Sequence, residues 1–304
     1  MHKTIKHIVK KISILMLLFS LFFASTLNVS AAGGAFTLTP MYQQIILTPG
    51  EAYEGNFEIT NPANSSIDFE YELRIEPFSA DDKNSISLTA NGDYNQIVDW
   101  ITLPFTEGSV APNMTEKINF TINVPEDAAA GGQYASIVIS SKPKSATNAS
   151  VDIQEVYQSA HLIYAEVAGE TVRKGTIDSI NVPGFLFSGN ISGNATITNT
   201  GNVHSRANHT LQIFPLFSDE EVFTNEEDPA HIWIMPGNTT YKEVSWDSTP
   251  SIGIFHVIYN VEFEGVNQKV DKMVIVCPLW LLFIIAAIIF LIIFKILSGK
   301  REKK

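Results

Sequence analysis

The chain has 304 residues, of which 45% are hydrophobic and 17% charged, and its formal net charge at pH 7 is −12. This acidic balance argues against nucleic acid as a partner, because phosphates repel a surface with excess negative charge. The single cysteine, Cys277, excludes an internal disulfide framework. An exported domain without disulfides is more typical of a bacterium than of an animal cell surface.

The first 32 residues have the three parts of a secretory signal. Four lysines and no acidic residue lie among the first eleven residues, an apolar run covers residues 12–24, and small residues dominate positions 29–33. We predict a signal peptide at residues 1–32, cleaved after Ala31 or Ala32. An uncleaved N-terminal anchor is the alternative.

The region after the signal has the periodicity of strands. Short segments rich in Val, Ile, Thr, Phe and Tyr alternate with clusters of Pro, Gly and Asn. Within residues 57–60, 69–75 and 117–124, apolar and polar side chains alternate with a period of two. This period places one face of each segment in a core and the other in water, as in a β-sandwich. Only residues 93–100 indicate a helical turn.

The strand-rich region contains an internal repeat. Residues 56–78 align with residues 194–216 at a constant shift of 138 positions. Eight residues of the first segment recur identically in the second: Asn56, Ile59, Thr60, Asn61, Asn64, Leu73, Ile75 and Pro77. The repeat predicts two copies of one sandwich. A shared β-sheet composition without common architecture is the alternative explanation.

The boundary between the two copies is expected at a run of small and polar residues. Residues 142–150 are prone to turns. We therefore predict a distal immunoglobulin-like sandwich at residues 33–143, a linker at 144–149 and a membrane-proximal immunoglobulin-like sandwich at 150–271. Each has about the length of an immunoglobulin domain.

The C-terminal region predicts a membrane anchor. Residues 273–294 contain no charge, and basic residues dominate the tail at 295–304. We predict a transmembrane helix at 273–294 that contacts the lipid bilayer, a cytoplasmic tail, and a single-pass protein of the cell membrane with its sandwiches outside. A buried core helix is the alternative. The expected fold is all-β, with two sandwiches in tandem plus this helix.

The predicted extracellular region carries 31 acidic and 11 basic residues, a net charge of −20. Such a surface favours cationic partners or bound cations, or simply keeps an exposed protein soluble.

A search for catalytic chemistry yields no predicted site. The region has five histidines, none of which has the spacing of a zinc site: His161, His204, His209, His231 and His256. No nucleophile elbow, P-loop or dinucleotide fingerprint occurs. We therefore predict no catalytic, cofactor-binding or metal-binding residues, and a protein that is not an enzyme.

Acidic residues gather in three short stretches, at residues 81–84, 219–221 and 226–228. Calcium needs several converging oxygen ligands, and none of the three stretches has the spacing of a calcium loop. Solvated loops are the prediction, with calcium sites as the alternative.

Several short motifs resemble a known family. They are Leu47-Thr-Pro49-Gly50, Phe57-Glu-Ile-Thr-Asn61-Pro62, Trp100-Ile-Thr-Leu103, Val124-Pro125-Glu-Asp and Gly132-Gln-Tyr134. The chain resembles bacterial surface proteins that interact with WxL-domain proteins. The resemblance implies a peptidoglycan-binding first module and a host-binding second module, and it identifies no binding residues.

These observations predict a non-enzymatic bacterial surface protein involved in adhesion. Its distal sandwich would bind cell-wall glycan (peptidoglycan) or a surface protein. One alternative is a structural spacer or assembly subunit that pairs with another protein through a sheet edge, which an exposed, uncharged edge strand in the first sandwich would favour. The other alternative is a ligand-sensing co-receptor.

Overall fold

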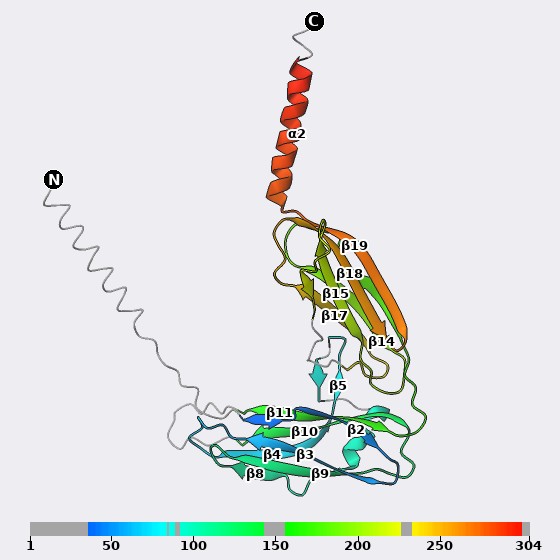
Figure 1. Cartoon of the computed structure of the whole chain (residues 1–304). Helices are drawn as coiled ribbons and strands as arrows, with labels where there is room; N and C mark the ends of the chain where they lie inside the picture. Colours follow the sequence, from blue (N-terminus) through cyan, green and yellow to red (C-terminus); the bar gives the residue numbers. More distant parts are fainter. Residues whose placement is uncertain (1–35, 84, 89–91, 143–155, 226–232, 300–304) are drawn as a thin grey trace, which may run out of the picture.

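The structure is a computed structural model that describes residues 36–83, 85–88, 92–142, 156–225 and 233–299. Within these ranges it contains nineteen β-strands, one 3-10 helix and one α-helix. The strands form two sandwiches, and Figure 1 shows that the strands of one run crosswise to those of the other. The prediction of an all-β, immunoglobulin-like architecture is confirmed. The predicted signal peptide lies outside the described residues.

The first sandwich consists of a four-stranded and a five-stranded sheet. The first sheet has the order β1-β3-β9-β7, with β1 (Thr37–Thr39), β3 (Ala52–Thr60), β9 (Thr115–Asn123) and β7 (Ile101–Thr102). The second has the order β2-β11-β10-β4-β8, with β2 (Tyr42–Leu47), β11 (Gln158–Val167), β10 (Gly131–Ser141), β4 (Phe69–Pro77) and β8 (Glu107–Val110). Alternation builds the core between them: Phe57 and Ile59 are buried, and Glu58 between them is exposed.

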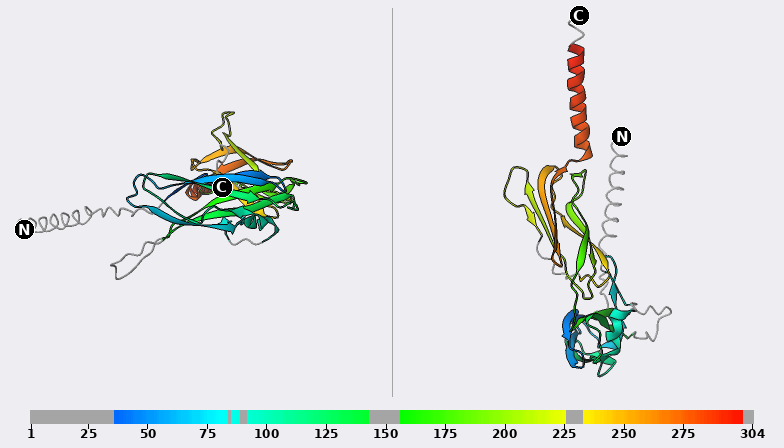
Figure 2. Two further views of the ribbon diagram at one scale, coloured as in Figure 1. Left: turned by 90° about the horizontal axis from the view of Figure 1, so that it is seen from below. Right: turned by 90° about the vertical axis from the view of Figure 1, so that its right-hand side faces the viewer.

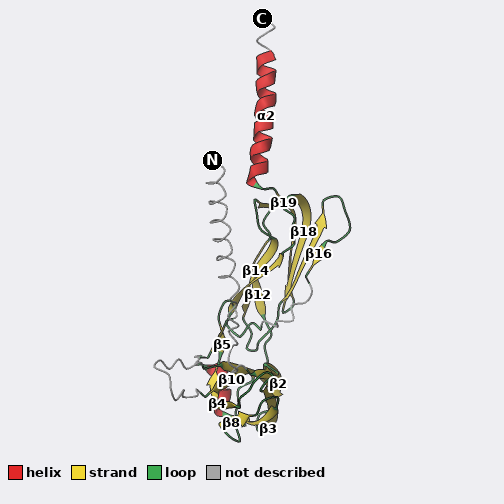
Figure 3. Cartoon of the chain, turned by 90° about the vertical axis from the view of Figure 1, so that its left-hand side faces the viewer, coloured by secondary structure: helices red, strands yellow, loops and turns green. Residues whose placement is uncertain are grey.

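Two small elements decorate the first sandwich. The 3-10 helix η1 (Asp93–Asp99) lies at the expected helical turn and contacts β10. The hairpin of β5 (Ser79–Ala80) and β6 (Ile86–Ser87) rises from the first sandwich beside the second, as Figure 3 shows for β5.

The sandwich boundary differs from the prediction. Strand β11 follows the predicted linker at 144–149, yet it pairs with β10 along ten residue pairs and with β2. The first sandwich therefore extends to Val167, and the second begins with β12 at Gly175. The run of small and polar residues lies between two strands of one sheet, and sequence alone does not distinguish such a connection from an interdomain linker.

The second sandwich also consists of two sheets, one three-stranded and one five-stranded. One sheet has the order β12-β14-β17, with β12 (Gly175–Asn181), β14 (Ile191–Asn199) and β17 (Thr239–Trp246). The other has the order β13-β19-β18-β15-β16, with β13 (Phe185–Leu186), β19 (Val266–Val276), β18 (Gly253–Phe263), β15 (Asn208–Pro215) and β16 (Phe223–Thr224).

The internal repeat is confirmed by equivalent strands and by an equivalent buried asparagine. The repeated segments form β3 and β4 in the first sandwich and β14 and β15 in the second. Asn61 follows β3, and its amide donates to the carbonyls of Ile67 and Val110. Asn199, at the end of β14, donates in the same way to two backbone carbonyls. Each side-chain amide thus binds two backbone carbonyls at the end of its sandwich, where the ladder of the sheet ends.

The C-terminal helix α2 (Leu279–Gly299) corrects the predicted anchor. Among the described residues, no helix has the length and apolarity needed to traverse a bilayer, which contradicts the transmembrane helix at 273–294 and the single-pass localisation. The predicted segment begins inside β19, which runs to Val276.

Candidate functional site

Strand β2 is an edge strand of the first sandwich. It lies at one end of the order β2-β11-β10-β4-β8 and pairs in parallel with β11, from Tyr42 opposite Leu162 to Leu47 opposite Val167. Its six residues, Tyr-Gln-Gln-Ile-Ile-Leu, carry no charge. Natural edge strands are usually protected by charge, by brevity or by a covering segment, because their open backbone groups invite another strand.

The backbone of β2 presents hydrogen-bonding groups on its open side. The carbonyls of Met41 and Leu47 accept from the amides of Leu162 and Ala168 in and after β11. Backbone groups of successive residues in a strand point to opposite sides. Gln44 and Ile46 therefore direct their N–H and C=O groups away from β11, where no strand among the described residues pairs with them.

The two faces of β2 have different surroundings. Ile45 and Leu47 point inward and are buried in the core of the first sandwich. Ile46 points outward and is 73% exposed. The strand thus combines a fixed inner face with an accessible apolar outer face and an open edge.

Other edges in the described part of the chain are shorter, charged or covered. Strand β8, at the far edge of the same sheet, begins with Glu107, which pairs with Lys142. Strand β17 in the second sandwich is eight residues long, but the amide of Tyr241 donates to the carbonyl of Asp82 in the β5–β6 hairpin. Its edge is therefore partly covered by the first sandwich.

The outer face of β10 and β11 meets the second sandwich in an aromatic joint. Tyr134 of β10 and Tyr164 of β11 pack with Met235 and with the partly buried Trp233. The ring of His204 lies among them, with its centroid 5.7 Å from that of Tyr134 and 4.9 Å from that of Trp233. Burial raises the pKa of Tyr164 to about 12, so this hydroxyl stays neutral at pH 7.

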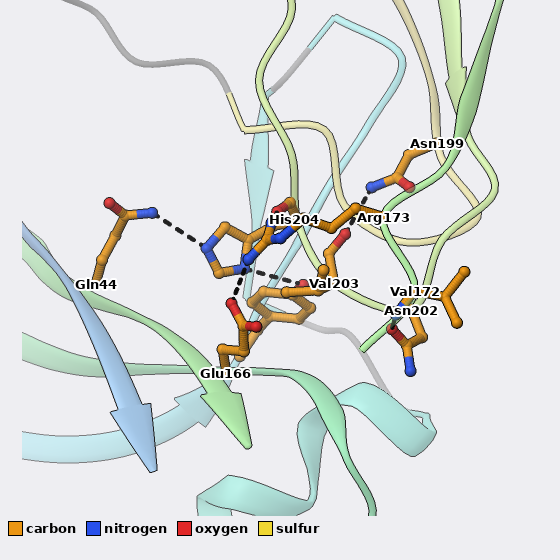
Figure 4. Close-up of polar contacts among 9 residues, drawn as sticks. Gln44, Glu166, Val172, Arg173, Asn199, Asn202, Val203 and His204 are labelled. Atoms are coloured by element: carbon orange, nitrogen blue, oxygen red, sulfur yellow. Dashed lines mark hydrogen bonds and ion pairs between the residues drawn. The ribbon is translucent and has the colours of Figure 1, made fainter. Parts of the chain in front are cut away.

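His204 ties the joint to the edge strand. Nε2 of Gln44 lies 3.2 Å from Nε2 of His204 (Figure 4). Oη of Tyr134 lies 3.4 Å from Nδ1 of the same ring. An amide nitrogen only donates, so Nε2 of His204 accepts and Nδ1 carries the proton. Burial, together with the nearby charge of Arg173, lowers the pKa of His204 to about 4. The ring is consequently neutral at pH 7.

Polar contacts hold the rest of the joint. Arg173 pairs with Glu166 of β11 at 2.5 Å and donates to the carbonyl of His204 at 3.3 Å, as Figure 4 shows. The carbonyl of Asn202 accepts from the amide of Gly132 at 2.7 Å. A Cβ atom at Gly131 would lie 2.7 Å from that same carbonyl, so this close approach requires glycine. In the right-hand view of Figure 2, the first sandwich is seen along its strands, and the second sandwich lies against one side of it.

The histidines found in the sequence have separate structural environments. His161 is buried in the core of the first sandwich, and its ring stacks on that of Phe57 with the centroids 4.9 Å apart. His209 contacts Tyr259, and His256 pairs with Asp271. His231 lies outside the described residues. Across the described ranges, no group of three or more His, Cys, Asp or Glu side chains is arranged to hold a metal ion.

The acidic stretches have local roles where the structure describes them. Asp81 accepts from the backbone amides of Lys83 and Ser85, and these bonds lower the pKa of its carboxyl. The carboxylate of Glu221 accepts from the side-chain amide of Gln212. Residues 226–228 lie outside the described residues. The expectation that calcium is not bound at these stretches stays a prediction.

Sequence reasoning named the criterion for this site but missed its position. An exposed, uncharged edge strand was expected to favour pairing, yet no segment was assigned to it. The available signal is the uncharged run from Met41 to Thr48 between Pro40 and Pro49. The joint around His204 could not be found from sequence, because its residues come from both sandwiches.

Comparisons with known proteins show similarity only at the level of the fold. No family model and no curated protein matches the chain. The class 5 fimbriae chaperone CfaA is 13% identical, with a TM-score of 0.37 over 81% of this chain and 100% of that chain. The E. coli chaperone DraB is 9% identical, with a TM-score of 0.36 over 79% and 98% of the two chains. The Pseudomonas aeruginosa CupB2 chaperone is 10% identical, with a TM-score of 0.31 over 75% and 96%.

At these TM-scores the likeness says nothing about function. The resemblance to WxL-interacting proteins is not tested by these comparisons and stays a prediction.

Proposed function

We propose that this chain is a non-enzymatic binding or assembly protein that holds a partner protein by strand addition to the open edge of β2. The observation that carries the proposal is an uncharged six-residue edge strand whose residues Gln44 and Ile46 point their backbone groups away from the sheet. Peptide segments that extend an existing sheet gain backbone hydrogen bonds for affinity and side-chain contacts for specificity.

The rigidity of β2 supports this role. Its inner residues Ile45 and Leu47 are packed in the core, and its other edge is bonded to β11. A partner strand would therefore meet a template that is already ordered. Little conformational entropy would be lost on the side of this protein, which favours binding.

The charge of the first sandwich indicates the character of the partner. Residues 36–167 contain 18 acidic and 5 basic residues, a net charge of −13. The edge itself is neutral and apolar at Ile46. The arrangement fits an extended segment with an uncharged centre and basic residues near its ends.

Crosslinking would identify the partner. A photo-crosslinking residue is placed at position 46 in cells that make the protein, with position 109 on β8 as the control.

Residue-resolved amide exchange then tests this mode of binding directly. In the purified complex, we expect the amides of Gln44 and Ile46 to exchange far more slowly than in the free protein. The amides of Gln43 and Ile45, which by alternation already face β11, should change little. Uniform protection, or protection confined to another face, would contradict strand addition.

A pair of substitutions separates edge pairing from general charge effects. Ile46→Lys places a charge on the proposed edge, whereas Ser109→Lys places the same charge on the opposite edge of the same sheet. We expect the first to weaken partner binding at least tenfold and the second to leave it within twofold. Equal effects of both would show that the partner reads overall charge instead.

A further inference from the structure

The inner face beside β2 contains a buried hydrogen-bond acceptor without a donor. Nε2 of Gln43 donates to the backbone carbonyl of Asn56 in β3 at 2.9 Å. Its Oε1 atom is buried, and no donor among the described residues reaches it. An unpaired buried acceptor is uncommon in folded proteins and calls for an explanation.

A second acceptor of the same kind lies nearby. Nδ1 of His161 is 2.8 Å from the carbonyl of Pro40, and because a carbonyl only accepts, Nδ1 carries the hydrogen. Burial lowers the pKa of His161 to about 4, so the ring is neutral at pH 7 and Nε2 is a bare acceptor. That atom is also buried and lacks a donor within the described part of the chain.

The side chains of Gln43 and His161 both point to the inner face of their sheet. Gln43 lies opposite Ile163 in the β2–β11 pair, and His161 is two residues before Ile163, so both side chains point to one face. Across from them lie Asn56, which holds Gln43, and Phe57, which stacks on His161.

At this edge of the sandwich, neither sheet continues with a further full-length strand. Strand β1 pairs with β3 only at residues 58–60, so residues 52–57 of β3 pair with β9 alone among the described strands. Strand β2 is likewise open on its outer edge. Gln43 therefore lies on the edge strand to which a partner strand would be added, and His161 lies one strand further in, on β11.

We infer that the partner strand presents a neutral donor side chain, of Ser, Thr, Asn or Gln, at the inward position opposite Gln43, where it donates to Oε1 of Gln43. This inference rests on the proposed strand addition. Residues directly opposite in neighbouring strands point to the same face, so the side chain at that position would enter between the sheets. Gln43 would then be a residue that determines specificity.

The chemistry of the position excludes the other side-chain classes. An aliphatic side chain would leave the buried oxygen unpaired, which carries the full cost of its desolvation. A carboxylate would meet two acceptors in a sandwich of net negative charge. A lysine ammonium would lose its hydration without gaining a counter-ion, since Gln43 and His161 are both neutral.

Binding of synthetic peptides to the full chain tests the inference. The probes are fluorescent extended decapeptides with a lysine at each end and uncharged residues between, identical except for Ser, Asn, Val or Asp at the central position. Two series place that position on alternate faces of the strand. In one series, we expect the Ser and Asn peptides to bind about fivefold more tightly than the Val peptide, as one additional neutral hydrogen bond allows. The Asp peptide should bind most weakly.

Variants locate the effect. Gln43→Met removes the amide at similar length and should abolish the preference for Ser and Asn over Val, whereas Gln44→Met, on the opposite face of β2, should preserve it. Thermal unfolding of each variant checks that it folds, and if Gln43→Met does not fold, the preference of the wild-type chain decides alone.

The outcomes separate this inference from the proposed function. If all peptides bind equally, or if Val is preferred because a water molecule already occupies the acceptor, the inference is overturned while strand addition stands. If no peptide binds in either series, the proposed strand addition fails with these probes, and the inference fails with it.

Discussion

The five-stranded sheets of the two sandwiches share one strand order but differ in the length of their first strand. The order β2-β11-β10-β4-β8 corresponds position by position to β13-β19-β18-β15-β16, and in both sheets the first strand pairs in parallel with the second. Strand β2 has six paired residues, whereas β13 has only two. The fold therefore accommodates this edge strand in a short form, and its length in the first sandwich is not required by the architecture.

The repeated residues teach the same lesson. Asn61 and Asn199 have the same structural role in the two copies, since each is buried and its side chain donates to two backbone carbonyls. Asn64 and Asn202 are also equivalent in sequence, but Asn64 is exposed, whereas Asn202 binds residues of the joint. Asn61 and Asn199 thus keep a common structural role. Asn64 and Asn202 differ in role because only Asn202 lies at the joint between the sandwiches.

Acidification should produce the largest difference between the two sandwiches. The pKa of His161 in the first core and that of His204 in the joint are both lowered to about 4, from an ordinary value near 6.5. Between these values the unfolded chain binds more protons than the folded one, so stability falls as the pH falls from about 6.5 to 4. Each histidine should cost about 3 kcal/mol over this window. Chemical denaturation at pH 7, 5.5 and 4 should show the loss in the first sandwich and the joint.

The second sandwich provides the internal control for this experiment. Within the described residues its hydrophobic core contains no histidine, and the pKa of Asp271 is lowered by His256, so that effect falls below pH 4. His161→Phe keeps a ring against Phe57 and should remove about half of the pH dependence. An unchanged pH dependence in this variant would show that other groups cause it.

The asparagine pair should give the next largest effect. Asn61→Ala and Asn199→Ala each remove two side-chain hydrogen bonds of a buried residue, and we expect each to lower the free energy of unfolding by about 2–3 kcal/mol. Urea denaturation checks the values. A large loss at one position and none at the other would break the structural equivalence of the two copies.

Much of this architecture follows from local sequence. The period-two alternation around Phe57 and Phe69 identifies strands because sandwich faces differ in polarity, and the identical residues at a shift of 138 reveal the duplication. The sandwich boundary does not follow, because the polar run before β11 has the composition both of an intrasheet connection and of a linker. Pairing of β11 with β10 decides between them, and pairing is a long-range property.

The structure of the C-terminal segment and the position of the candidate site could not be predicted from sequence for a related reason. Met273 to Val276 belong to β19 because they pair with β18, although they are as apolar as the helix that follows. Hydropathy cannot place that transition. Likewise, Gln43 and Gln44 look alike in sequence, yet one contacts β3 and the other contacts His204 of the second sandwich. Only the fold assigns their different faces.

Substitution of the diverged asparagines should give a smaller effect. Asn202→Ala removes side-chain bonds to the amide of Val172 and the carbonyl of Ala130, which should cost about 1–2 kcal/mol. Asn64→Ala, at the equivalent exposed position, should change the free energy of unfolding by less than about 0.5 kcal/mol. Denaturation followed by the fluorescence of Trp233, which lies in the joint, reports the first change. Equal costs at both positions would mean that Asn202 has no special role in the joint.

Substitutions on the edge strands β2 and β13 should have the smallest effect on stability. They give the most direct comparison of the two sandwiches. Ile46 is 73% exposed on β2 and Phe185 is 41% exposed on the equivalent strand β13, so lysine at either position should change the free energy of unfolding by less than about 1 kcal/mol. Binding of the partner should distinguish them, because β2 is long enough for several backbone bonds, whereas β13 has only two paired residues. Ile46→Lys should abolish binding in a pull-down, and Phe185→Lys should preserve it. If Phe185→Lys abolishes binding instead, the length of the edge strand is not what separates the two sandwiches, and the second copy contributes to the interface.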